Sequence, residues 1–158
     1  MLARGATKIA DRRFRWMVLV HIAVLLGAAC EVVFLKRPFI PVLAAVMFAL
    51  FLTANAVRWW VIHTMGQHWN VQVVDSTELG VVTSGPFHYV RHPNYAAVFI
   101  EMLALPLIHT AWITATLGTF AHVIVLMQRV SAEERVLLAN ADYRAAMAQK
   151  ARFLPGVF

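Results

Sequence analysis

Residues 85–95 read GPFHYVRHPNY, the densest run of polar, aromatic and turn-forming residues in a chain dominated by apolar segments. Long hydrophobic stretches flank this run on both sides, which places it at or near a membrane surface. Pro93 disfavours helix in the residues before it, and Asn94 is a good N-cap for an apolar helix that begins at Tyr95. Taken by itself, the run predicts a helix start anchored at the bilayer surface.

The composition indicates a membrane protein. Of the 158 residues, 61% are hydrophobic and 14% are charged, whereas a soluble domain is about half apolar and about one quarter charged. The net charge is +6, but the cations flank apolar segments, which is typical of membrane topology and not of a nucleic-acid groove. The single Cys30 excludes an internal disulfide. The histidines show no ligand spacing, so we predict no metal site.

The apolar segments predict about four membrane crossings, because a bilayer core needs roughly 20 helical residues. Residues 14–35 and 39–57 form the first two spans. Residues 95–127 are too long for one span and are interrupted at Pro106, so we predict a helical hairpin. Residues 129–150 form an amphipathic helix before a short extended tail. The predicted fold is an all-α integral membrane bundle with a C-terminal amphipathic cytoplasmic helix. It forms one domain, 1–158, with two N-terminal spans in residues 1–62.

Charge asymmetry predicts the orientation. The first 15 residues carry five cations, and five more follow Met127, whereas the expected hairpin tip has none. Cytoplasmic flanks are enriched in Lys and Arg, so both termini are expected in the cytoplasm. The 85–95 run and the polar residues after Met127 then lie on the same side of the membrane. Two distant polar clusters on one face can share a pocket, which Trp69 is also expected to line.

Two groups of acidic residues are candidates for chemistry. Glu133 and Glu134 are adjacent, so they point about 100° apart on a helix, and one can face a pocket while the other pairs with a cation. Ser131 and Glu134 have the spacing of a capping box, although continuation of the preceding helix fits equally well. Glu101 lies within an apolar span, where an ionisable group is costly. It is expected to meet His122, as a structural contact or in a substrate pocket.

The 85–95 run, Glu133-Glu134 some forty residues later, Tyr143 and the sequence RFLPG at 152–156 together resemble the isoprenylcysteine carboxyl methyltransferase family. The wider group includes the phospholipid methyltransferases. The resemblance covers residues 58–158 in broad pattern and is greatest to the small bacterial members. It implies a membrane-embedded methyltransferase that uses S-adenosylmethionine, with residues 63–158 as the cofactor-binding region. It also implies a bacterial inner-membrane location, and the charge asymmetry predicts that the active site is on the cytoplasmic side.

The resemblance assigns roles residue by residue. The residues carried over to the cofactor site are Arg91, His92, Pro93, Tyr95, Glu133 and Glu134. Arg152 is expected near the reacting group of the substrate. Glu101 is a second catalytic candidate because of its place in an apolar span, and not because of the resemblance.

The substrate class follows from the short chain, which leaves little protein for a long prenyl tunnel. We expect O-methylation of a lipophilic acceptor, either a carboxylate or a phenol-type lipid, delivered from the membrane lipids. The alternatives are N-methylation of a phospholipid headgroup, a nicotinamide-dependent membrane reductase and a non-enzymatic membrane scaffold. The oligomeric state stays open.

Overall fold

The computed structural model describes residues 7–8, 14–69, 74–75 and 80–156. Most of the cationic N-terminus used to predict orientation lies outside these residues. The five α-helices in the described part of the chain are α1 (Phe14–Phe34), α2 (Pro41–Met65), α3 (Pro93–Leu107), α4 (Trp112–Leu137) and α5 (Ala141–Met147). Two 3-10 helices, η2 (Gly66–His68) and η4 (Gly85–His88), lie in the connection between α2 and α3. The short strands β1 (Thr7–Lys8) and β2 (Val74–Asp75) pair antiparallel.

Three of the helices, α1, α2 and α4, are long and apolar enough to cross a membrane, with mean hydropathies of 2.4, 1.7 and 1.3. Their outward-facing side chains are largely exposed aliphatic and aromatic groups, as expected for helices that contact lipid. The predicted class, an α-helical integral membrane protein, is therefore confirmed. At 15 residues α3 spans about 22 Å, less than the roughly 30 Å of a bilayer core. A fourth complete crossing stays a prediction.

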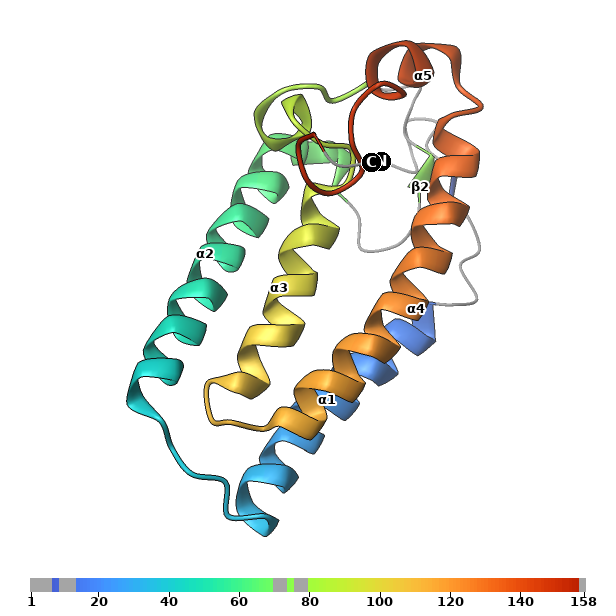
Figure 1. Cartoon of the computed structure of the whole chain (residues 1–158). Coiled ribbons are helices and arrows are strands. Elements are labelled where there is room, and N and C mark those ends of the chain that lie inside the picture. Colours follow the sequence, from blue (N-terminus) through green and yellow to red (C-terminus); the bar gives the residue numbers. More distant parts are fainter. Residues whose placement is uncertain (1–6, 9–13, 70–73, 76–79, 157–158) are drawn as a thin grey trace.

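The long helices pack in the order α2, α3, α4 and α1, while η4, α5 and the C-terminal tail gather at one end of the bundle (Figure 1). Glycine allows α1 and α4 to approach closely, because a Cβ on Gly118 would lie 2.4 Å from the Val24 side chain. At the opposite end of the bundle, Glu31 accepts hydrogen bonds from the first amides of α4, Ile113 N (3.1 Å) and Thr114 N (2.7 Å). Glu31 also pairs with Arg37 at 2.7 Å.

One expectation about helix ends was wrong, and one alternative that the sequence left open is now decided. Asn94 is not the N-cap of α3, since the helix begins at Pro93 after His92 and has no side-chain cap. Proline is well suited to the first helical position because its missing N–H would be unpaired there. Ser131 does not begin a new helix either. It lies inside α4, and its hydroxyl donates to Met127 O (2.8 Å).

The predicted C-terminal helix over residues 129–150 is in fact divided. Residues 129–137 are the end of α4, and a turn at residues 138–140 precedes α5. Asn140 caps α5, with its side chain accepting from Tyr143 N (3.0 Å). Tyr143 and Met147 then bury one face of the short helix, which holds it against the end of the bundle.

Candidate active site

The C-terminal tail lies directly on the 85–95 run. Val90 and Ala151 form a parallel bridge. Two backbone amides of the run donate to the tail, Arg91 N to Ala151 O and His92 N to Arg152 O, both at 2.9 Å. The tail therefore closes over the start of α3 and carries Arg152 to the same place as the motif residues.

Glu134 is the anion at the centre of this junction. Its Oε2 accepts from Arg152 Nη2 at 2.7 Å, and its Oε1 lies 3.1 Å from Arg91 Nη1 and 3.2 Å from His92 Nε2. A carboxylate only accepts hydrogen bonds, so Nε2 of His92 carries the hydrogen in this contact. Both Glu134 and His92 are buried, at 5% and 4% exposure. The contacts of Glu134 fix three segments to one another: the motif run, the end of α4 and the tail.

Glu133 points to a different partner, as expected for neighbouring positions on a helix. Its Oε2 accepts a 2.5 Å hydrogen bond from the Tyr95 hydroxyl, which in turn accepts from Arg129 Nε at 2.8 Å. The Arg129 guanidinium also lies over the Tyr95 ring, 5.7 Å from its centroid. Glu133, Tyr95 and Arg129 thus form a second polar group beside the Glu134 junction.

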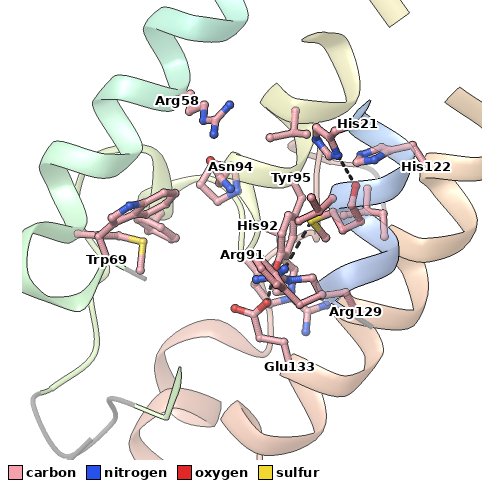
Figure 2. A pocket seen from close by; sticks show the side chains of 18 of the residues that line it. His21, Arg58, Trp69, Arg91, His92, Asn94, Tyr95, His122, Arg129 and Glu133 are labelled. Carbon is pink, nitrogen blue, oxygen red and sulfur yellow. Dashed lines mark hydrogen bonds between the residues drawn. The ribbon is translucent and has the colours of Figure 1, made fainter. Parts of the chain in front are cut away.

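A cavity of about 340 Å³ lies between α1, α2, α3 and α4 and opens beside the motif run (Figure 2). The volume is in the range of small-molecule sites, about 300–1,000 Å³. Its polar wall includes Arg91, His92, Asn94, Tyr95, Arg129 and Glu133, and its aromatic wall includes Phe14, Trp69 and Phe87. The expected position of Trp69 is therefore observed.

Two buried polar atoms on this wall have no hydrogen-bond partner among the described residues: Asn94 Oδ1 and Arg91 Nε. One is an acceptor and the other a donor. A buried polar group without a partner is costly, and on a cavity wall a ligand can supply the missing partner.

The structure gathers most of the residues expected at the site, but not on one surface. Arg91, His92, Pro93, Tyr95 and Glu133 line the cavity. In the described part of the chain, Glu134 and Arg152 are not part of that lining and stand behind it, in the ionic junction. Whether any of these residues contacts a cofactor stays a prediction.

The expected contact between Glu101 and His122 was wrong. Glu101 pairs instead with Arg58 of α2, at 2.9 Å, and Arg58 reaches the cavity wall. His122 packs against His21 of α1, with ring centroids 5.3 Å apart. Glu101 does have a polar partner, as expected for an acid in an apolar helix. The partner comes from α2, because α3 packs against α2 as well as against α4.

Arg58 and His21 were missed as cavity residues. Arg58 was given no role from the sequence, and His21 was considered only, with the other histidines, as a metal ligand. The available signal was weak for both residues, since it consisted only of a polar side chain within an apolar helix.

Tyr143 of α5 is buried near the two adjacent glutamates. Burial, with the negative charge of Glu133 as the next cause, raises the pKa of the Tyr143 hydroxyl to about 12. The hydroxyl is therefore neutral at physiological pH and adds no charge to the junction.

Fold and site together define an integral membrane protein with a ligand-sized cavity at one end of its helix bundle. A model of the isoprenylcysteine carboxyl methyltransferase (ICMT) family matches residues 45–139. The chain belongs to this family, and the resemblance noted in the sequence is confirmed.

The relatives are bacterial and eukaryotic. The chain is 29% identical over 135 residues to YpbQ of Bacillus subtilis, described as uncharacterized, covering 85% of this chain and 79% of that protein. It is 28% identical over 138 residues to an uncharacterized protein of Haemophilus influenzae, covering 87% and 80%.

The fold is similar to that of the eukaryotic intramembrane Ras methyltransferase ICMT, with a TM-score of 0.69 and 21% identity. The match covers 95% of this chain but 56% of the solved one, so the chain spans little more than half of that protein's length. This likeness establishes the fold alone.

Proposed function

We propose that the protein is an S-adenosylmethionine-dependent methyltransferase that methylates an oxygen of a lipophilic acceptor, a carboxylate or a phenol-type lipid. We place it in a bacterial inner membrane, with its termini and site on the cytoplasmic side. The observation that carries the proposal is the convergence, at one end of the cavity, of Glu133 with the unpartnered atoms Asn94 Oδ1 and Arg91 Nε.

The residues of the cavity fit the cofactor's chemical groups. S-adenosylmethionine carries an ammonium, a carboxylate and an adenine, and it supplies an electrophilic methyl group when bound. Glu133 and Asn94 Oδ1 are acceptors for an ammonium, and Arg91 Nε is a donor for a carboxylate. Trp69 and Phe87 offer aromatic faces for a base. The set is complete without Glu134, which we assign to holding Arg91 and His92 in place.

The chain's own contribution to the reaction is positioning and the exclusion of water. Tyr95 is fixed by Glu133 and Arg129, and Arg91 is fixed by Glu134, so the polar wall is rigid before a ligand arrives. Holding reactants in a fixed geometry is worth several kcal/mol of an activation barrier, about 7–11 at the extreme. Beyond the polar wall the cavity is lined by apolar side chains such as Val98 and Leu126, which keep water out.

The cavity has a route for an acceptor from the bilayer. Val18, Ile22 and Leu25 of α1 line it, and they are 40%, 47% and 55% exposed. An apolar opening of this kind admits a lipid tail laterally, while the polar wall stays at the end of the bundle. Arg152, at 40% side-chain exposure beside the polar wall, is proposed to stand near the acceptor's reacting group.

The test is a ligand titration of purified protein in detergent, followed by thermal unfolding. S-adenosylhomocysteine is expected to raise the melting temperature, and a nicotinamide dinucleotide is not. Tyr95→Phe is expected to weaken S-adenosylhomocysteine binding about tenfold, because it frees Glu133 and Arg129 from their shared hydroxyl. Glu31→Gln, at the other end of the bundle, is the control. No response to S-adenosylhomocysteine would refute the proposal.

A further inference from the structure

A second hollow lies against the C-terminal tail, at the same end of the bundle as η4 and α5 (Figure 1). It has a volume of about 410 Å³ and, among the described residues, shares only Arg91 with the central cavity between the four long helices. Its described lining consists of residues 148–152, Arg91 and Gly156. Three of these residues, Arg91, Lys150 and Arg152, are cations and none is an acid, so we call it the cationic hollow.

The cationic hollow keeps an excess of positive charge. Glu134 pairs with both Arg91 and Arg152, at 3.1 and 2.7 Å. Lys150 has a neutral partner, since its Nζ donates to the carbonyl oxygen of Phe87 at 2.6 Å. Three cations less one carboxylate leave two positive charges that these contacts do not neutralise. The hollow is therefore suited to an anion, and Lys150 is its least neutralised cation.

An apolar groove of about 250 Å³ lies next to the same tail, between α2, η4 and α3. Its described lining shares only Pro93 with the central cavity. Trp60 and Tyr89 line the groove and are 51% and 58% exposed. Tryptophan and tyrosine are enriched where a membrane meets water. The groove therefore lies at the depth of lipid headgroups, where an acyl chain can enter it from the bilayer.

The apolar groove and the cationic hollow meet along the tail. Phe153 and Pro155 line the groove, whereas the adjacent residues Arg152 and Gly156 line the hollow. The Cα atoms of adjacent residues are about 3.8 Å apart. One phospholipid can therefore place a chain on one side of the tail and its phosphate on the other.

We propose that the groove and the hollow together bind one anionic phospholipid of the surrounding membrane, with an acyl chain in the groove and the phosphate at Lys150. This lipid stays outside the central cavity and is not methylated. Because it contacts α2, α3 and the tail together, it holds the tail over the start of α3. The inference does not depend on the proposed methyltransferase function.

Charge and shape together select the lipid. A phosphodiester is an anion that only accepts hydrogen bonds, and the Lys150 ammonium has further hydrogens to donate besides the one bound to Phe87 O. Phosphatidylcholine adds a quaternary ammonium to the phosphate, which the excess of cations repels. Inorganic phosphate has the charge but leaves the groove without an occupant. Phosphatidylglycerol is complementary to both parts of the site.

The experiment follows thermal unfolding of the purified full-length protein after detergent exchange, without S-adenosylhomocysteine. It is titrated with dioleoyl phosphatidylglycerol, dioleoyl phosphatidylcholine or inorganic phosphate. Phosphatidylglycerol is expected to raise the melting temperature at about fivefold lower concentration than phosphatidylcholine, the value of one favourable cation. Inorganic phosphate at the same concentrations is expected to have no effect. Equal stabilisation by both lipids, or by phosphate alone, would overturn the proposal.

Two charge variants test the hollow. Lys150→Gln is expected to weaken phosphatidylglycerol binding about fivefold, and Lys150→Arg is expected to keep it. Arg144→Gln is the matched control, because Arg144 is an exposed cation of α5 that does not line the hollow, and its loss changes the net charge equally. If Lys150→Gln and Arg144→Gln have equal effects, only the net charge matters and the site is wrong.

A filling variant tests the groove. Thr53 is exposed on α2 and lines the groove, so Thr53→Trp occupies the space without disturbing a packed side chain. It is expected to leave the melting temperature of the lipid-free protein unchanged and to weaken binding of phosphatidylglycerol at least fivefold. Unchanged binding would show that no acyl chain enters the groove and would overturn the proposal. Binding of S-adenosylhomocysteine, measured separately, decides the methyltransferase function alone.

Discussion

The substitution Glu134→Gln removes the negative charge of a carboxylate that Arg91, His92 and Arg152 share. Removing one partner of a buried ion pair costs about 3–5 kcal/mol, because the remaining charge stays buried. Glu134 and Arg91 are nearly buried, at 7% and 13% side-chain exposure, but Arg152 is 40% exposed and is partly screened by solvent. We therefore expect a loss near the lower end, about 3 kcal/mol. In a protein of this size the melting temperature falls by about 10 °C.

Glu133→Gln is the matched comparison, because it makes the same chemical change one residue away. Glu133 lines the cavity and accepts from Tyr95 alone among the contacts described above. We expect it to change the free energy of unfolding of the ligand-free protein by less than about 1 kcal/mol. It is expected to weaken S-adenosylhomocysteine binding by about tenfold or more, as the loss of a charged acceptor does.

The assay is thermal unfolding of each variant in detergent, with and without saturating S-adenosylhomocysteine. Glu134→Gln is expected to lower the melting temperature of the ligand-free protein. Glu133→Gln is expected to reduce the increase in melting temperature that the ligand causes. The opposite assignment, with Glu133→Gln unstable and Glu134→Gln unable to bind, would refute the division between the two carboxylates. Arg152→Gln should cost less than Glu134→Gln, since it leaves Arg91 paired.

Three further outcomes are expected. Glu31→Gln should cost about 2 kcal/mol of stability by weakening its ion pair with Arg37 and its contact with the N-terminus of α4, with no change in S-adenosylhomocysteine affinity. The raised pKa of Tyr143 should make stability fall as the pH rises from about 10 to about 12, because the unfolded chain loses this proton first. Tyr143→Phe should reduce that fall in thermal unfolding. Arg58→Gln should destabilise the bundle more than the double variant Arg58→Gln/Glu101→Gln, because the single change leaves the Glu101 carboxylate buried at 9% exposure and unpaired.

Much of the architecture could be predicted from the sequence because the membrane imposes strong rules. Apolar length alone located α1, α2 and α4, and the interruption at Pro106 predicted the turn that separates α3 from α4. The placement of the 85–95 run beside Glu133 and Glu134 was also predicted, from charge asymmetry and the family pattern. In the structure Glu134 is within 3.2 Å of His92. These features depend on composition and order along the chain, which sequence records directly.

Side-chain partners were harder to predict. The error at Glu101 came from pairing it with the next helix in sequence, whereas α3 also packs on α2, where Arg58 is within reach. The alternatives at Ser131 stayed open in the sequence, because a capping-box spacing carries no information on whether the preceding helix has ended. Inside α4 the hydroxyl simply bonds to the carbonyl four residues back. Such contacts are set by tertiary packing.

The two unpaired groups of the cavity make different demands on a ligand, and together they restrict it. At the bundle end, Arg91 Nε and Asn94 Oδ1 stand among charged residues and favour a zwitterionic molecule. Deeper in the bundle, His122 is fully buried, and both of its ring nitrogens lack a partner among the described residues. His122 precedes Glu133 by 11 positions on α4, which is about 16 Å along the helix axis. Two ligands that meet end to end satisfy both groups, and a transfer reaction between a polar donor and a lipid acceptor requires that arrangement.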